Sequence, residues 1–212
     1  MVLLVDSTVD SVTDTVFRGM FAARKSVFID LLKWDLPVLD GRYEVDQFDD
    51  AHARYLILTN ADHAHLASAR LLPTTRPHIL DTLFPALCER AVPRGPRVWE
   101  ISRFCLGRQL RAAERRQVRN QLVSAIAAHA LQAEIEIYTG VAEIAWLEQI
   151  LSFGWQCRPL GEPLPNQGAI LGALEITITP NTPADLTAGG VWFPIVPTNC
   201  RRAAPPTAEA PR

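Results

Sequence analysis

The sequence predicts an α/β sandwich built around a mixed β-sheet. Stretches rich in branched and aromatic residues alternate with amphipathic helical stretches along the chain. The 212 residues are 48% hydrophobic, which is enough for one sizeable core. We therefore expect one domain over residues 1–196. A tail rich in proline and alanine follows over residues 197–212, and we expect it to be disordered.

The first half of the chain predicts a strand, a helical region, a loop and a hairpin. Apolar residues at three- and four-residue spacing from Val9 to Leu32 indicate one long helix or two short ones. Pro37, Asp40-Gly41 and a cluster of acids make residues 34–50 a loop long enough to be functional. The remaining elements expected here are strands at 2–5, 54–60 and 66–74, a helical segment near 79–91 and a strand at 98–106.

In the second half of the chain, stretches with the hydrophobic period of a helix alternate with stretches typical of strands. Gly107 breaks the chain after the 98–106 strand, and Gly154 stops a later helix. The expected elements are an amphipathic helix at 111–132, a strand at 134–141, a helix at 142–153, strands at 155–160 and 169–179, and a short helix at 180–190.

Composition excludes several classes of function. A net charge of −2 argues against nucleic-acid binding. There is no 18-residue apolar run for a membrane span, and the N-terminus becomes polar too soon for a signal peptide, so we expect a soluble, cytoplasmic protein. The four cysteines lack a CxxC pair and fit reduced thiols, and the acids of residues 46–50 lack the spacing of a calcium loop. We therefore expect no metal.

The strand at 98–106 carries two opposite charges in an apparent core element. Alternation along a strand places Glu100, Ser102 and Phe104 on one face and Ile101, Arg103 and Cys105 on the other. Ionised side chains are rarely buried without partners. These charges therefore indicate either a structural ion-pair network or a functional cleft.

Arginines, acids and aromatic residues recur elsewhere in a particular order. They are Arg24, Phe28, Trp34, Asp46, Asp49, Arg70, Phe84, Glu100 and Arg103. In this order and spacing, over roughly residues 1–195, the chain resembles the acyl-homoserine-lactone synthases, the autoinducer synthases of bacterial quorum sensing. The resemblance implies a fold like that of the Gcn5-related N-acetyltransferases, a three-layer αβα sandwich with a mainly antiparallel central sheet.

The resemblance also implies an acyltransferase. Such enzymes join S-adenosylmethionine, a substrate rather than a cofactor, to an acyl chain delivered on acyl carrier protein, and release the lactone, methylthioadenosine and the free carrier. The residues then expected to be catalytic are Arg24, Asp46, Asp49, Arg70, Glu100 and Arg103. The substrate's α-amine has an ordinary pKa of roughly 7.7–8.0, so Glu100 is the candidate general base, directly or through a water. Its strength depends on how far Arg70 and Arg103 depress its pKa.

The other binding roles follow from the same resemblance. Phe28 and Trp34 would pack on the adenine and the sulfonium. Arg24 and Arg103 would hold the substrate carboxylate or the adenosine, with Phe104 beside them. Asp46 and Asp49 would pair with Arg24 and Arg70 to order the loop, with solvated loop acids as the alternative. Main-chain N–H groups of residues 102–106 are our candidate for stabilising the oxyanion.

The acyl chain is expected between the sheet and the later helices. The predicted lining is Phe84, Ser102, Leu122, Ile126, Thr139, Trp146, Leu147, Ile150 and Leu174, with ordinary core as the alternative for each. Trp146, if it points inward, would limit the pocket to a medium chain. A threonine near the end of the preceding strand is associated with 3-oxo chains in this family. Here that position is either Thr139 or Gly140, which favours an unsubstituted chain slightly.

A basic run follows the central strand. Its members are Arg108, Arg111, Arg115, Arg116 and Arg119. They form either a solvated helix face or a surface that steers an acidic carrier protein to the cleft.

Two rival functions remain. A coenzyme-A-dependent N-acetyltransferase would place a glycine-rich loop here to approach the pyrophosphate, but an arginine, Arg111, stands where its first glycine belongs. A non-catalytic binding module would be expected to lose Glu100 or the pair Arg24 and Trp34, and all three are present. We expect a synthase that acts as a monomer.

Overall fold

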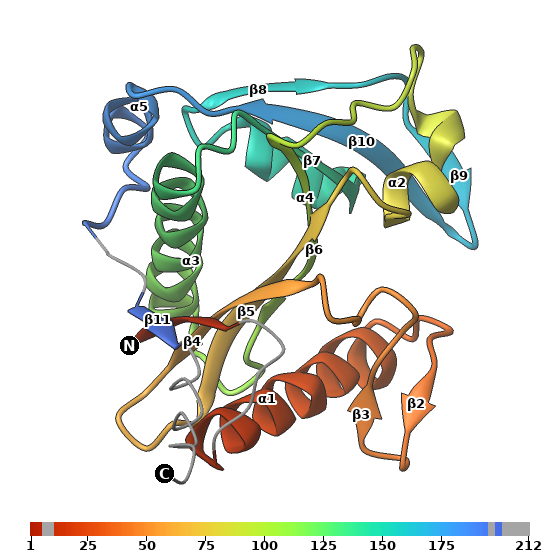
Figure 1. Ribbon diagram of the computed structural model, residues 1–212. Coiled ribbons are helices and arrows are strands. Elements are labelled where there is room, and N and C mark those ends of the chain that lie inside the picture. The colour runs from red at the N-terminus through yellow and green to blue at the C-terminus, as the bar shows by residue number, and fades with distance from the viewer. Residues whose placement is uncertain (6–10, 195–197, 201–212) are drawn as a thin grey trace, which may run out of the picture.

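The computed structural model describes residues 1–5, 11–194 and 198–200, which form one β-sheet with helices on both faces (Figure 1). The strand order is β11-β1-β4-β5-β6-β7-β10-β8, with β9 beside β10. The strands are β1 (Val2–Val5), β4 (Arg54–Thr59), β5 (His65–Pro73), β6 (Val98–Leu106), β7 (Ile137–Glu143), β8 (Gln156–Pro159), β9 (Leu164–Asn166), β10 (Ala169–Thr177) and β11 (Thr198–Cys200). Among the strands of the described residues, only the pairs β1–β11 and β6–β7 are parallel, so the prediction of a mixed, mainly antiparallel sheet is confirmed.

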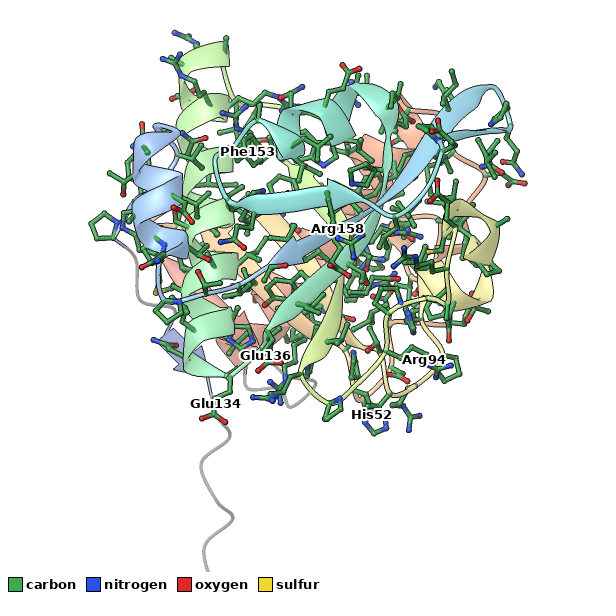
Figure 2. All side chains as sticks on the ribbon, turned by 90° about the horizontal axis from the view of Figure 1, so that it is seen from above. His52, Arg94, Glu134, Glu136, Phe153 and Arg158 are labelled. Carbon is green, nitrogen blue, oxygen red and sulfur yellow. The ribbon has the colours of Figure 1, made fainter. Side chains whose placement is uncertain are left out.

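Helices cover the sheet on both sides, which confirms the three-layer sandwich. The helices are α1 (Ser11–Arg24) with its π-helical continuation η1 (Lys25–Leu31), α2 (Ile79–Thr82), the 3₁₀ helix η2 (Pro85–Leu87), α3 (Ala112–Gln132), α4 (Ile144–Leu151) and α5 (Thr182–Ala188). Val16 and Met20 of α1 pack on one face with Ile57 of β4. Leu122 and Ile126 of α3 pack on the other. Charged side chains such as Glu136 and Arg158 lie on the outside (Figure 2).

The centre of the sheet is split. Strands β6 and β7 pair from Val98 opposite Ile137 only as far as Ile101 opposite Gly140, and beyond that point they diverge (Figure 1). The second half of β6 stays paired with β5 on its other side. The split therefore leaves one edge of β6, from Ser102 onward, facing a gap in the middle of the molecule.

A β-bulge lies at this same point. The register between β5 and β6 shifts so that Ser68 opposes Cys105 but Arg70 opposes Ser102. Two residues of β6, Arg103 and Phe104, thus occupy the space opposite one residue of β5. Arg103 has a left-handed φ of 51°, which is uncommon for a residue with a side chain. A bulge of this kind re-aims side chains.

The predicted elements differ from the observed ones in two N-terminal regions. The expected loop at 34–50 contains a small hairpin, β2 (Val38–Leu39) and β3 (Tyr43–Glu44). Its turn residues Asp40 and Gly41 both have positive φ, as tight hairpin turns require. The expected helix at 79–91 is reduced to α2 and η2, because Pro85 has no N–H to continue the ladder.

Two short strands were not predicted from the sequence. One is β9, which contains Pro165 and pairs with β10 at the edge of the sheet. The other is β11, which lies beside β1 in residues assigned to the tail. The rest of the predicted tail, at 197 and 201–212, lies outside the described residues. Within the described part of the chain, no helix has the length and apolar character needed to cross a membrane.

Candidate functional site

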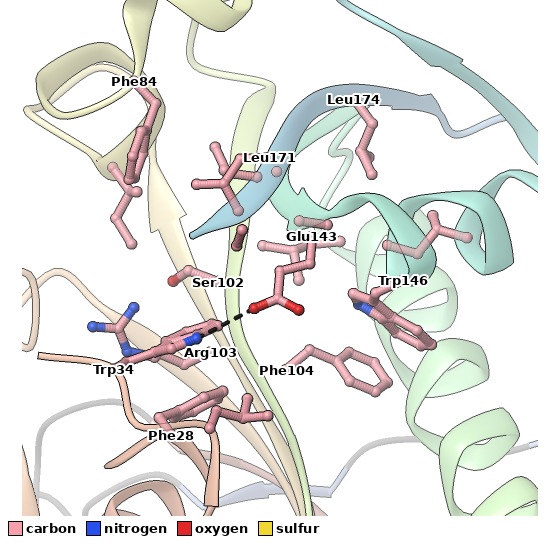
Figure 3. Close-up of a pocket in the computed structure, with 18 of the residues that line it drawn as sticks. Phe28, Trp34, Phe84, Ser102, Arg103, Phe104, Glu143, Trp146, Leu171 and Leu174 are labelled. Atoms are coloured by element: carbon pink, nitrogen blue, oxygen red, sulfur yellow. Dashed lines mark hydrogen bonds between the residues drawn. The ribbon is translucent and has the colours of Figure 1, made fainter. Parts of the chain in front are cut away.

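A cavity of about 1180 Å³ occupies the split between β6 and β7. It extends from η1 and the following loop, across β6 and β7, to α3 and α4 (Figure 3). Its lining is mainly apolar, with a few polar groups at the level of the bulge. They include Ser102, Arg103 and Glu143. Such a pocket suits an elongated ligand with one polar end.

A buried ion-pair network holds the loop of residues 34–50 against the sheet. Arg24 donates from Nη1 and Nη2 to the two oxygens of Asp49, both at 2.8 Å, and from Nε to Glu44. Arg70 donates to Asp46 at 2.6 and 3.1 Å, and its Nη1 lies 2.9 Å from Asp49. The predicted pairing of these two arginines with the two aspartates is confirmed.

The network keeps the side chains of Arg24 and Arg70 away from the cavity. Both side chains are buried, with exposed fractions of 1% and 0%, and neither lines the cavity. Glu44 and Asp49 occupy the guanidinium of Arg24, which was predicted to contact the substrate. Burial alone would raise the pKa of Asp49, but hydrogen bonds from Arg24 and the charge of Arg70 hold that pKa well below its usual range.

Arg103 lies on the same side of the sheet as this network. Its Nε and Nη2 donate to Glu44 Oε1 at 3.1 and 3.0 Å, and Nη2 donates to Asp46 at 2.7 Å. The predicted alternation is thus wrong from this residue onward, because the bulge turns Arg103 to the face of Ser102. Phe104 turns instead to the opposite face, where its ring centre lies 5.0 Å from that of Trp146.

Glu100 is buried at the wall of the cavity. Its Oε1 accepts the main-chain N–H of Ile79 at 3.1 Å, and its Oε2 accepts that of Leu80 at 2.7 Å. Burial raises the pKa of Glu100 to about 7, against the opposing effect of these two hydrogen bonds and the weaker effect of Arg70. Arg103 is directed to Glu44 instead. Glu100 can therefore exchange a proton near neutral pH.

An aromatic pair forms the wall facing the bulge. The rings of Phe28 and Trp34 stack with centres 5.0 Å apart and planes 16° apart, and both line the cavity. The guanidinium of Arg103 lies 5.7 Å from the Phe28 ring centre. Across the split, Trp34 Nε1 donates to Glu143 Oε1 at 3.3 Å (Figure 3).

Most of the predicted acyl pocket lines the cavity. The residues that do so are Phe84, Ser102, Ile126, Thr139, Trp146, Ile150 and Leu174. Leu122 and Leu147 do not, so their assignment to the pocket is wrong, and both belong to the core. Helical periodicity marks the buried face of a helix but does not separate side chains packed on the sheet from those that reach a cavity. Trp146 lies between Phe104 and Phe153, at 5.0 and 5.8 Å.

Thr139 and Gly140 line different sides of the cavity. Tyr138 and Ala142 belong to the core with α3, and alternation along β7 places Gly140 on that side and Thr139 on the side of α2. The Thr139 hydroxyl is buried and has no hydrogen-bond partner among the described residues. Where α3 faces the cavity, β7 thus presents a glycine.

The basic run divides into two groups. Arg108, Arg111 and Arg116 are exposed around the start of α3. Arg115 donates to the Gly107 carbonyl at 3.2 Å and lines the cavity. Arg119 lies over the Phe153 ring and donates to Asn120. The exposed arginines therefore stand next to the cavity and project into solvent.

Sequence reasoning missed three polar residues of the site. Glu44 is completely buried and joins Arg24 to Arg103. The Tyr55 hydroxyl donates to Asp49 at 2.8 Å. Glu143 faces the cavity from the end of β7. One feature of the sequence could have identified Glu44, namely its position two residues before Asp46 in the acidic loop. In the described residues, no group of three or more His, Cys, Asp or Glu could hold a metal.

Known proteins similar to this chain agree on one family. A family model described as autoinducer synthase matches residues 9–181. An acyl-homoserine-lactone synthase of Rhizobium etli is 32% identical over 165 residues, 76% of this chain and 77% of that protein. One of Ralstonia nicotianae is 47% identical over 83 residues, 38% of this chain and 41% of that protein. The chain thus spans less than half the length of this second relative.

Solved structures agree on the fold. The coenzyme-A-dependent acyl-homoserine lactone synthase BjaI, with SAM and isopentyl-CoA, matches with a TM-score of 0.84 and 24% identity, over 96% of this chain and 95% of that one. A protein of Lactobacillus plantarum described as an N-acetyltransferase matches with a TM-score of 0.57 and 16% identity, over 84% and 98%. At these identities the likeness establishes the fold, which is the one the sequence predicted.

Proposed function

The chain belongs to the autoinducer synthase family, and we propose that it is an acyl-homoserine-lactone synthase that acylates the amine of S-adenosylmethionine. The position and the raised pKa of Glu100 are the main support for this proposal. It is a buried carboxyl with a pKa of about 7, at the wall of a cavity that also contains a stacked aromatic pair and a guanidinium. A base with a pKa near the working pH is suited to deprotonating an amine.

The reaction begins when Glu100 takes a proton from the substrate ammonium group. The free amine attacks the thioester carbonyl, forms the C–N bond and places negative charge on the carbonyl oxygen. The bulge and the free edge of β6 leave main-chain groups near Arg103 available to stabilise that oxyanion. Collapse of the intermediate breaks the C–S bond. The nitrogen loses one proton to the leaving thiolate, which gives the amide and the free thiol.

Lactone closure is an internal displacement. The substrate carboxylate attacks the carbon next to the sulfonium, the C–S bond breaks, and methylthioadenosine leaves as a neutral thioether. The protein's task is to hold a folded conformer in a cavity with little water. Phe28 and Trp34 pack on the adenosyl part, and Arg103 holds the carboxylate end. Arg24, Arg70 and their acids position this wall without touching the substrate.

Acyl carrier protein is the proposed donor partner. Arg108, Arg111 and Arg116 are exposed at the start of α3, beside the cavity, where a positive surface would attract an acidic carrier. The same segment has no glycine-rich loop to cradle a pyrophosphate: α3 begins at Ala112, after Arg111. A coenzyme A thioester is the competing donor.

The proposed chain is of medium length and unsubstituted. Trp146 lines the cavity between Phe104 and Phe153, and its indole would limit the length of a bound chain. Gly140 presents no hydroxyl to the side of the cavity that faces α3, so β7 offers no side-chain donor to a 3-oxo group there.

A direct assay tests the function. The purified protein is incubated with S-adenosylmethionine and a series of acyl chains of increasing length, each bound to acyl carrier protein or to coenzyme A. Mass spectrometry then measures lactone and methylthioadenosine. We expect both products, made faster with the carrier-bound chain and strongly reduced in Glu100→Gln. Consumption of acetyl-coenzyme A without any lactone would overturn the proposal in favour of an N-acyltransferase.

A further inference from the structure

Glu143 points into the cavity from the end of β7, at the boundary between its aromatic wall and its acyl end. Its side chain is half-buried and lies between Trp34 on one side and Trp146 on the other (Figure 3). Its Oε1 accepts the indole N–H of Trp34 at 3.3 Å. A neutral donor thus holds one carboxylate oxygen, and the other remains available to a ligand.

The charge of Glu143 is not balanced by the protein. Within the described ranges, no lysine, arginine or histidine lies within ion-pair distance of it. Two other acids that line the cavity have partners within the protein. Asp46 is paired with Arg70 and Arg103, and Glu100 accepts two main-chain N–H groups. The cavity wall therefore offers a carboxylate without a cation partner to a ligand that carries a positive charge.

The surroundings of Glu143 suit a compact cation. Aromatic faces attract positive charge, and here Trp34 stacks on Phe28 directly beside the carboxylate. Arg103 already lies near the Phe28 ring, which leaves the Trp34 end for the ligand. We propose that Glu143 recognises the sulfonium charge of S-adenosylmethionine and so selects the sulfonium substrate over neutral thioethers.

This inference rests on the proposed function and adds a role for the site. The substrate amine must lose its proton before it attacks, so the sulfonium is the positive charge that persists until lactone closure. Closure converts the sulfonium to the thioether of methylthioadenosine. The attraction to Glu143 is thereby lost when the product forms, which favours its release. Glu143 acts in substrate recognition and takes no part in proton transfer.

Binding measurements separate charge recognition from shape. S-adenosylmethionine and S-adenosylhomocysteine differ by one methyl group and the positive charge it creates. Isothermal titration of each ligand into the wild type, Glu143→Gln and Glu148→Gln gives the ratio of the two dissociation constants for each protein. Gln keeps an oxygen that can accept the Trp34 N–H. Glu148 is exposed on α4 and outside the cavity, so it controls for loss of one negative charge nearby.

We expect the wild type and Glu148→Gln to prefer S-adenosylmethionine. In Glu143→Gln that preference should fall by about tenfold, the lower range for a close charge pair, while affinity for S-adenosylhomocysteine and methylthioadenosine stays unchanged. Equal weakening of all three ligands would overturn the inference, because Glu143 would then only position Trp34. An unchanged preference would also overturn it. Wild type that binds none of them and makes no lactone would refute the proposed function itself.

Discussion

Arg103 donates from Nε and Nη2 to a single oxygen of Glu44, at 3.1 and 3.0 Å, and so joins the bulged centre of β6 to β3. The other oxygen of Glu44 accepts from Arg24. One fully buried carboxylate therefore fixes two guanidinium groups. The cavity wall at Arg103 depends on a residue that does not itself line the cavity.

Removal of Glu44 should destabilise the whole protein. In Glu44→Ala, two arginines that are buried or nearly so lose a charge partner, and we expect the free energy of unfolding to fall by about 3–5 kcal/mol. Urea denaturation measures this change. Asp62→Asn, at an exposed position of the β4–β5 turn, should change stability by less than about 0.5 kcal/mol. A loss for Glu44→Ala as small as that of the control would contradict the structural role of the pair.

The buried carboxyl of Glu100 should make stability depend on pH. Its pKa in the folded protein, about 7, is above the usual 4.5, so between these values the folded state binds the additional proton. Stability from this group therefore falls as pH rises from about 4.5 to 7, by up to roughly 3 kcal/mol. Glu100→Gln carries no titrating group.

The comparison is made by urea denaturation of the wild type and Glu100→Gln at about pH 5 and about pH 8. Other titrating groups contribute equally to both proteins and cancel in the difference. We expect that difference to shift in favour of the variant at the higher pH. The same difference at both values would mean that the Glu100 carboxyl titrates in its ordinary range.

The fold was largely predictable because its elements are long and regular. The strand at 98–106 was predicted with its observed bounds, and α3 within one residue at its start. The prediction of secondary structure failed at very short elements and at prolines. Strand β9 is three residues long and contains a proline, and Pro85 divides a stretch that looks helical. An element of three or four residues contains too few repeats for a hydrophobic period to be recognised.

The sequence predicted which residues of the site form ion pairs, but it did not predict the directions in which all the side chains point. Arg24 with Asp49 and Arg70 with Asp46 follow from residue types and order. The face of Arg103 did not, because a single bulge reverses the alternation. Glu143 was predicted within the helix at 142–153, but it is the last residue of β7. Only the three-dimensional split between β6 and β7 brings it to Trp34.

The exposed arginines of the basic run should control the use of a carrier-bound donor. Charge reversal in Arg111→Glu with Arg116→Glu should lower kcat/KM for acyl carrier protein about tenfold at low salt, because steering by surface charge is lost. The loss should shrink at high salt, which screens such charges. Reaction with an acyl thioester of a small thiol should be unchanged.

Arg76→Glu is the control for this experiment. Arg76 is exposed, as Arg111 and Arg116 are, but it lies past the opposite end of β5 from the start of α3. Its reversal should leave the salt dependence of the carrier reaction as in the wild type. An equal effect of both reversals would indicate a response to net charge and would contradict docking at α3.

Two neighbouring residues of α4 should separate chain selection from stability. Trp146 lines the cavity and Leu147 packs in the core. Trp146→Leu removes ring volume beside Phe104, so mass spectrometry of the lactones should show a shift to longer acyl chains. Leu147→Ala should lower the free energy of unfolding by about 2–5 kcal/mol and leave the distribution of lactones unchanged. If Leu147→Ala shifted chain length as much as Trp146→Leu, the end of the cavity would be set by core packing as a whole rather than by the indole of Trp146.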